Sequence, residues 1–219
     1  MSHQHRAVAA DGTPIAWSRT GTGPPAILVH GITESAAAFD PVTERLSSGN
    51  SVITLDLRGH GESGRSEVYD LAAMATDVAA VIADAGVDRP HLVGHSLGGA
   101  VVTAAGSMLD VASVVDVDQS LQLGEFKEQL ASAEAMLRDP EQYHLVVDAM
   151  FEMMMGDVVD PSEGDRINSL RRADHPVVLG AWELLLTQSV EECFGTVQRR
   201  ETGNHLLDAG QVEVVLIED

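Results

Sequence analysis

The pattern G-x-S-x-G at residues 94–98 constrains the fold of this chain more than any other feature of its sequence. A short apolar run, residues 91–93, precedes it, and helical spacing over residues 97–108 follows. A serine between a strand and a helix sits on a sharp, strained turn, where side chains two positions away would clash. Gly94 and Gly98 relieve that crowding, because neither carries a Cβ atom. The turn also aims the helix amino end at Ser96, which favours developing negative charge there.

The first half of the chain alternates apolar runs with helical patterns. Runs that are apolar on both faces, such as residues 26–30, are typical of buried strands in a parallel sheet. The expected strands are residues 13–20, 26–30, 51–56, 91–93 and 112–117, and the expected helices are residues 36–46, 69–85 and 97–108. This alternation predicts the α/β class, with a doubly wound, mostly parallel sheet and right-handed crossovers.

From about residue 121 to residue 190 the pattern changes to helices without an evident strand. The expected helices are residues 126–137, 143–155 and 177–186, with breaks at Asp139-Pro140 and Asp160-Pro161. We therefore expect a helical cap inserted after the sixth strand. The chain divides into a core (1–120), a helical cap (121–192) and a C-terminal remainder of the core (193–219).

Three segments together resemble the α/β-hydrolase family, over the chain up to about Leu123. The first is the G-x-S-x-G turn. The second is residues 26–31, which end in His30-Gly31 like the family's oxyanion loop. The third is D-L-R-G-H-G-E-S at residues 56–63, similar to the turn after the family's fourth strand. The resemblance implies the α/β-hydrolase fold, with Ser96 as the nucleophile and the backbone N–H groups of Ile32 and Leu97 as the oxyanion hole.

A serine nucleophile needs a base and an orienting acid, which follow it in this family in the order Ser, Asp or Glu, then His. The strand that usually carries the acid after the cap is not found, so one strand–helix unit of about 40 residues is missing. Residues 195–200 resemble the family's final strand, residues 203–207 its G-x-x-H turn, and residues 212–219 a shortened last helix.

On that basis His205 is the expected base, and the alternative is an exposed turn histidine. His175 is the fallback, although it precedes Pro176 and also fits a linker. Asp118 is the expected acid, because it ends a strand at the carboxyl edge of the sheet, where it could equally cap a turn. Asp116 lies deeper in the same strand and is the weaker candidate.

The substrate pocket is expected to include Met150 and Met154, His30 of the oxyanion loop, and His95 beside the nucleophile. Met150 and Met154 belong to a methionine cluster on one expected helix. Such clusters are usually ordinary core, but here part of one would roof the site as an adaptable apolar pocket. For His30 and His95, packing or local hydrogen bonding is the simpler role, and neither is expected to be the base.

The charge excludes some partners. A net charge of −21 at pH 7 repels nucleic acid and anionic membranes. No apolar run approaches the roughly 18 residues that span a bilayer, the first residues lack the apolar stretch of a signal peptide, and Cys193 is the only cysteine. We expect a cytoplasmic protein with a small-molecule substrate, no metal and no cofactor.

The expected function is hydrolysis of a small ester, thioester or lactone with an apolar acyl group, through an acyl-enzyme. Two alternatives stay open. One is a cofactor-free perhydrolase or lyase that uses the same site, and the other is an inactive ligand- or partner-binding member. Because a missing strand would leave the edge of residues 112–117 unpaired, we also expect low stability and self-association as a homo-oligomer, through that edge or through apolar surface of the cap.

Overall fold

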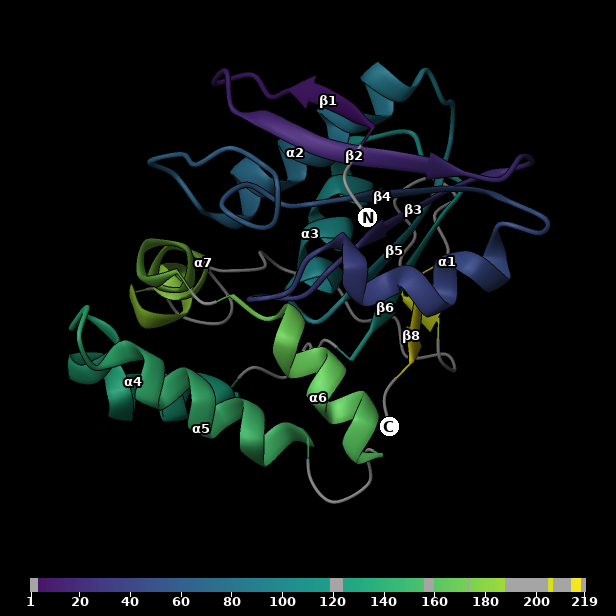
Figure 1. The fold of residues 1–219 in the computed structure, drawn as a ribbon. Helices are drawn as coiled ribbons and strands as arrows, with labels where there is room; N and C mark the ends of the chain where they lie inside the picture. Colours follow the sequence, from purple (N-terminus) through teal and green to yellow (C-terminus); the bar gives the residue numbers. More distant parts are fainter. Residues whose placement is uncertain are drawn as a thin grey trace.

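A computed structural model describes residues 4–118, 124–155, 160–172, 174–187, 205–206 and 214–217 (Figure 1). Its centre is one sheet with the strand order β1-β2-β4-β3-β5-β6-β8-β7. The strands are β1 (His5–Val8), β2 (Pro14–Thr20), β3 (Pro25–Val29), β4 (Ser51–Leu55), β5 (His91–His95), β6 (Ser113–Val117), β7 (His205–Leu206) and β8 (Val214–Ile217). Strands β4, β3, β5, β6 and β8 run parallel, and antiparallel pairs flank them at both edges. The predicted α/β class and mostly parallel sheet are confirmed.

The core helices follow the strands in the order that a doubly wound sheet requires. They are the 3-10 helix η1 (Ala36–Phe39), α1 (Asp40–Leu46), α2 (Leu71–Ala85) and α3 (Leu97–Met108). Figure 1 shows α1 in front of the strands and α2 and α3 behind them. Strand side chains such as Ile27, Ile53 and Leu92 are fully buried with Met74 of α2 and Val101 of α3 in one hydrophobic core. Buried apolar strands between two helical layers explain why these runs are apolar on both faces.

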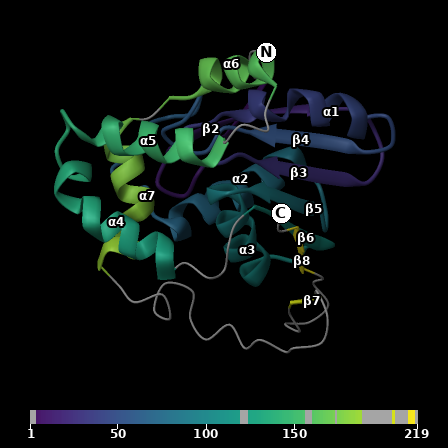
Figure 2. The same ribbon diagram turned by 90° about the horizontal axis from the view of Figure 1, so that it is seen from below.

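Four further helices follow β6 and form the predicted cap. They are α4 (Gly124–Leu137), α5 (Tyr143–Met155), α6 (Pro161–Leu170) and α7 (His175–Thr187), which we call the cap helices. In Figures 1 and 2 they lie together on one side of the sheet. Leu130, Val147 and Trp182 form a second hydrophobic core, which also contains Ile32 from the loop after β3. The cap therefore packs directly on the loop that the sequence predicts to be the oxyanion loop.

The turn at residues 56–63 is a hydrogen-bonded structural element. The Asp56 carboxylate accepts the backbone N–H groups of Ala36, at 2.8 Å, and Glu62, at 2.7 Å. The Arg58 guanidinium donates two hydrogen bonds to the buried carboxylate of Asp77 on α2, at 2.8 and 2.7 Å. It also reaches Asp11 in the β1–β2 hairpin, at 3.0 Å. The turn therefore fixes the edge strands and α2 to the centre of the sheet.

The C-terminal part of the structure corrects one expectation. Val214–Ile217, which we expected to lie in a shortened last helix, is a strand that pairs in parallel with β6, with Val115 opposite Val215. The run Val-Val-Leu-Ile favours a strand, because three of its four residues are branched at Cβ. The edge of β6 is thus paired, which removes one of the two routes by which self-association was expected, and the apolar surface of the cap stays a prediction. Residues 195–200, the expected final strand, lie outside the described residues.

Besides the strands β7 and β8, two elements were not expected from the sequence. They are the edge strand β1 and the helix α6, which begins at Pro161 directly after its N-cap, Asp160. The Asp160-Pro161 pair therefore starts a helix where we expected only a break, and proline suits the first helical position. Among the described helices, none is long and apolar enough to cross a membrane.

Candidate active site

Ser96 lies at the tip of the turn between β5 and α3, with backbone angles φ 51° and ψ −122°. A positive φ is costly for a residue with a side chain, and it persists only where the surrounding structure imposes it. Here the Ser96 N–H is held by the Val117 carbonyl at 2.9 Å. A Cβ atom on Gly94 would lie 2.1 Å from the Gly98 carbonyl oxygen, and one on Gly98 would lie 2.1 Å from that of Val29. The spacing of the two glycines is thus a steric requirement of the turn.

The loop at residues 30–34 runs beside this turn, because β3 and β5 are parallel neighbours with Val29 opposite Gly94. We call these residues the oxyanion loop. His30 is fully buried, and its Nε2 atom accepts the Leu57 N–H at 3.0 Å. Its Nδ1 atom therefore carries the proton and donates to the Gly31 carbonyl at 2.8 Å. Burial lowers the pKa of His30, which keeps the ring neutral.

The position of the Gly31 carbonyl determines where the Ile32 N–H points. The two groups belong to one planar peptide unit, in which the N–H and C=O bonds point in opposite directions. The carbonyl accepts hydrogen bonds from His30 and, at 3.3 Å, from the Glu34 N–H. The Ile32 N–H is therefore directed away from His30 and Glu34, and the Ile32 residue lines a cavity together with Ser96.

Glu34, the last residue of this loop, forms an ion pair with His95, the residue before Ser96. The Glu34 carboxylate accepts from His95 Nδ1 at 3.2 Å and from the Gly31 N–H at 2.9 Å. The hydrogen bond to Glu34 raises the pKa of His95, although burial opposes this. Burial also opposes ionisation of Glu34, but His95 and the Gly31 N–H outweigh it and lower the pKa of Glu34. The pair is thus charged on both partners at mildly acidic pH.

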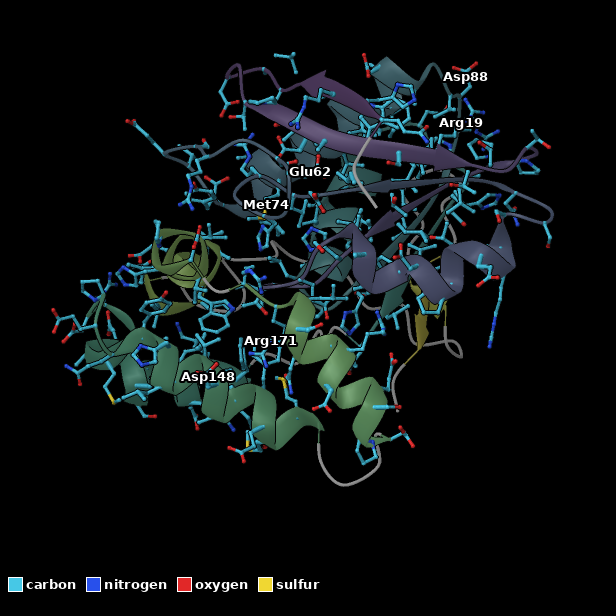
Figure 3. All side chains as sticks on the ribbon, in the orientation of Figure 1. Arg19, Glu62, Met74, Asp88, Asp148 and Arg171 are labelled. Atoms are coloured by element: carbon cyan, nitrogen blue, oxygen red, sulfur yellow. The ribbon has the colours of Figure 1, made fainter. Side chains whose placement is uncertain are left out.

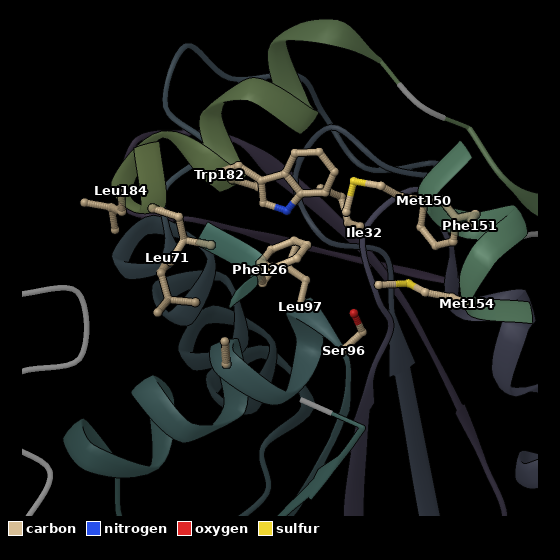
Figure 4. Close-up of a pocket in the computed structure, with 13 residues that line it drawn as sticks. Ile32, Leu71, Ser96, Leu97, Phe126, Met150, Phe151, Met154, Trp182 and Leu184 are labelled. Carbon is tan, nitrogen blue, oxygen red and sulfur yellow. The ribbon is translucent and has the colours of Figure 1, made fainter. Parts of the chain in front are cut away.

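The cavity has a volume of about 100 Å³ and lies between the Ser96 turn and the cap helices (Figure 4). Its walls are almost entirely apolar, and the polar atoms among the side chains labelled in Figure 4 are the Ser96 hydroxyl and the Trp182 indole nitrogen. The core contributes Ile32, Leu71, Ser96, Leu97 and Ala100, and the cap contributes Phe126, Met150, Phe151, Met154, Ala181, Trp182, Leu184 and Leu185. Such a cavity suits the apolar part of a small molecule whose polar group lies at the Ser96 hydroxyl.

The structure places the predicted site residues in different surroundings. Met150 and Met154 line the cavity. His30 and His95 do not line the cavity, and each is hydrogen-bonded to a residue of the oxyanion loop, His30 to Gly31 and His95 to Glu34. Asp118 is exposed at the carboxyl end of β6, one residue beyond Val117, which pairs with His95. It therefore stands level with Ser96 on the neighbouring strand.

The backbone of His205 lies in β7, which pairs with β8 so that His205 is opposite Val215. Strands β6 and β8 separate β7 from β5, which corresponds to about 14 Å between the two strand axes. His175 is the first residue of α7, and its Nε2 atom lies 2.9 Å from the Leu137 carbonyl. Within the described residues, no side chain hydrogen-bonds to the Ser96 hydroxyl, and no group of three or more His, Cys, Asp or Glu side chains could hold a metal ion.

Sequence reasoning did not identify Glu34 or the aromatic walls of the cavity, Phe126 and Trp182. The ring centroids of these two aromatic residues are 5.9 Å apart, in an edge-to-face arrangement. The sequence feature that could have indicated Glu34 is its position three residues after Gly31. At this spacing its carboxylate can accept a hydrogen bond from the Gly31 N–H. Trp182 gave a weaker signal, as one apolar residue among many in an apolar helix.

A family model described as the alpha/beta hydrolase family matches residues 26–201. The chain therefore belongs to this family. It is 43% identical over 101 residues to a 2-(acetamidomethylene)succinate hydrolase of Mesorhizobium japonicum, an alignment that covers 45% of this chain and 36% of that protein. It is 34% identical over 102 residues to an sn-1-specific diacylglycerol lipase ABHD11 of Xenopus laevis, covering 45% and 33% of the two chains. The alignments thus span about a third of these relatives.

Solved structures extend the likeness to most of the fold. A thermophilic esterase from Thermogutta terrifontis superposes with a TM-score of 0.69 at 25% identity, over 85% of this chain and 73% of that one. A hydrolase from Pseudomonas aeruginosa superposes with a TM-score of 0.72 at 18% identity, over 97% and 89% of the two chains. The second likeness is in fold alone. The two superpositions cover far more of this chain than the sequence alignments do.

Proposed function

We propose that this protein is a serine hydrolase that cleaves a small ester, thioester or lactone with an apolar acyl group. The observation that carries the proposal is the position of Ser96, which is held at positive φ at the base of an apolar cavity. Ile32 and Leu97, the residues whose N–H groups are the proposed oxyanion donors, line the same cavity. The esterase, lipase and hydrolase names among its relatives support this class of reaction.

In the proposed reaction the Ser96 Oγ atom attacks the carbonyl carbon, and its proton passes to a base. The carbonyl oxygen becomes an oxyanion, which the N–H groups of Ile32 and Leu97 stabilise. Collapse of this intermediate expels the alcohol or thiol, which takes the proton from the base, and leaves an acyl-enzyme. Water then attacks the acyl-enzyme by the same route and releases the acid.

The acyl group is assigned to the cavity because its walls offer contact area but almost no hydrogen-bonding partners. Phe126, Trp182 and the flexible methionines Met150 and Met154 would enclose an aliphatic or aromatic acyl chain. A charged acyl group would lose its hydration there without a compensating partner, which is unfavourable. This step of the proposal is independent of the identity of the base.

For the acid and the base we retain Asp118 and His205. Asp118 is supported by its place at the carboxyl end of β6, level with Ser96. Its positive φ of 55° is a second feature of the kind that occurs at functional turns. His205 is supported by the need for a late histidine in this family, and its strand is two positions further along the sheet than β6. The two roles are therefore tested separately.

The test of the function compares the hydrolysis of p-nitrophenyl butyrate by the wild-type chain and by two variants. Ser96→Ala removes the nucleophile. Ser107→Ala removes an exposed hydroxyl on α3, the helix that follows Ser96, where this hydroxyl donates to the Ala104 carbonyl at 2.7 Å. We expect loss of turnover in Ser96→Ala and wild-type turnover in Ser107→Ala. If wild-type protein is folded but inactive towards a panel of esters, thioesters and lactones, the inactive binding protein becomes the better account.

A further inference from the structure

Beside the packing of Ile32 on the cap, hydrogen bonds connect the cap to the oxyanion loop at Thr33. The Arg172 N–H donates to the Thr33 carbonyl at 2.6 Å, and Arg171 Nε lies 3.4 Å from Thr33 Oγ1. Arg171 and Arg172 belong to the linker between α6 and α7, so a segment of the cap is bonded directly to the residue after Ile32. Thr33 itself is buried, with 1% of its surface exposed.

Thr33 is held in an unfavourable backbone conformation, with φ 67°. A β-branched side chain in this left-handed region is a genuine outlier, which the surrounding structure must impose at a cost in free energy. On the core side, the Gly31 peptide group is fixed by His30 and Glu34. On the cap side, the described contacts of Thr33 are those with Arg171 and Arg172. The segment that carries the Ile32 N–H is thus held between the core and the cap.

The same linker also contacts the wall of the cavity. The Arg171 guanidinium stacks on the ring of Phe151, 3.6 Å from its centroid, and Phe151 lines the cavity. Figure 3 shows Arg171 beside Asp148 of α5, the helix that carries Phe151, and the two charged groups are 3.8 Å apart. On the other side, Asp174 pairs with Arg65 of the core at 2.5 Å. A ligand in the cavity that displaces Phe151 would therefore also displace Arg171 and the linker that carries it.

We propose that the α6–α7 linker completes the oxyanion hole: the Arg172 N–H holds Thr33, and thereby the Ile32 N–H, where the tetrahedral intermediate requires it. The inference rests on the proposed function, because it assigns a purpose to the Ile32 N–H. Arg172 is a positioning residue in this account, and it acts through its backbone. Its consequence is that the position of the cap governs the chemical step in addition to the binding of substrate.

Two substitutions of Arg172 distinguish the role of its backbone N–H from that of its side chain. Arg172→Pro removes the N–H, whereas Arg172→Ala keeps it and removes only the guanidinium, which contacts the Ser169 and Arg171 carbonyls. Proline is compatible with the preceding residue, because Arg171 has φ −71° and ψ 138°, the extended conformation that a residue before proline adopts. The readouts are kcat and KM for p-nitrophenyl butyrate and the Kd of a phenylboronic acid, which adds to an activated serine as a tetrahedral anion.

We expect Arg172→Pro to lower kcat by about 10- to 100-fold relative to Arg172→Ala, with KM changed by less than about threefold. This is less than the roughly 100- to 1,000-fold loss on removal of an oxyanion donor, because the Ile32 N–H is displaced and not removed. The affinity for the boronic acid should fall by the same factor as kcat/KM, and the urea midpoint of Arg172→Pro should fall only by what the loss of one hydrogen bond costs. Equal kcat values in the two variants, or a loss of kcat with unchanged boronic acid affinity, would overturn the proposal.

A second measurement applies if Arg172→Pro does not fold. Thr33→Val and Arg171→Ala each remove one partner of the Thr33 Oγ1 contact, so their effects on kcat should not add in the double variant. Additive effects, or none, contradict the inference. Failure of the proposed function gives a different result: wild-type protein would then show no Ser96-dependent turnover, whereas failure of this inference leaves that turnover intact in Arg172→Pro.

Discussion

Glu34 and His95 form an ion pair of 3.2 Å next to the Ser96 turn, although they are 61 residues apart in the sequence and neither lines the cavity. The Glu34 carboxylate also accepts the Gly31 N–H. The pair therefore ties the nucleophile turn to the oxyanion loop. Since one partner is a histidine, the strength of this connection should depend on pH.

The first prediction concerns that pH dependence. The pKa of His95 is raised above its usual 6.5 by Glu34, so its contribution to stability is complete below pH 6.5 and is lost as pH rises through the raised pKa. The pKa of Glu34 is lowered from 4.5, so its contribution is complete above pH 4.5 and is lost as pH falls through the lowered pKa. The pair should stabilise the fold most between pH 4.5 and pH 6.5.

A double-mutant cycle of Glu34→Gln and His95→Gln, followed by urea unfolding, measures the coupling between the two side chains. We expect a larger coupling free energy at pH 5.5 than at pH 9. A coupling that is the same at both pH values would mean that His95 does not change its protonation state between them, since the Glu34 carboxylate is ionised at both.

The second prediction concerns the buried arginine of the turn after β4. Arg58 is 1% exposed and pairs with the fully buried Asp77. Arg58→Ala leaves that carboxylate buried without its main partner, and we expect a loss of about 3–5 kcal/mol in the free energy of unfolding. Arg138→Ala is the matched control, because Arg138 forms exposed ion pairs with Glu134 and Glu183. Its urea unfolding curve should overlay that of the wild type, and equal effects of the two substitutions would contradict this account of Arg58.

Local patterns predicted the parts of the fold that depend on neighbouring residues. The bounds of α3 and α5 agree with the sequence prediction, because apolar residues at helical spacing determine both. The Ser96 turn was located because Gly94 and Gly98 are required sterically, and the oxyanion loop was located through the resemblance of His30-Gly31 to the family. The Glu34–His95 pair was not predicted, since it arises from the adjacency of β3 and β5, which spacing along the chain does not encode. The strand β8 was missed because the resemblance favoured a helix over the β-branched composition of that run.

The third prediction concerns the steric requirement at the turn. A Cβ atom on Gly98 would lie 2.1 Å from the Val29 carbonyl oxygen, which belongs to the central strand β3 and has little freedom to move. Gly98→Ala should therefore destabilise the fold severely, with a large fall in the urea midpoint. Gly164→Ala in α6 meets no atom within 4 Å and should be neutral or stabilising by up to about 1 kcal/mol. A well-folded Gly98→Ala variant with wild-type stability would show that the turn is looser than described.

The fourth prediction concerns the acid. Asp118→Asn should lower turnover by several orders of magnitude if this carboxylate orients the base, because the amide fixes the wrong tautomer. Asp110→Asn is the control at the opposite end of β6, where Asp110 is exposed and pairs with Arg89 at 3.1 Å. It should retain wild-type kcat. An effect of Asp118→Asn below about tenfold, or about 1.4 kcal/mol, assigns the role to another group.

His205 is tested independently of Asp118. His205→Ala should reduce kcat as strongly as Asp118→Asn, and the double variant should lose little more, because residues that act as one unit are strongly non-additive. Full activity in His205→Ala, with low activity in Asp118→Asn, would mean that a different histidine serves as the base.

The most direct test of the central claim is covalent labelling of Ser96 by a fluorophosphonate, followed by intact-mass measurement. An activated serine displaces fluoride from phosphorus and gains one phosphonyl group, whereas an unactivated hydroxyl does not react on the same timescale. We predict rapid, stoichiometric labelling of the wild type and of Ser107→Ala, and none of Ser96→Ala. Wild-type protein that stays unlabelled while folded, or a Ser96→Ala variant that is labelled at the wild-type rate, would contradict the assignment of Ser96 as the nucleophile.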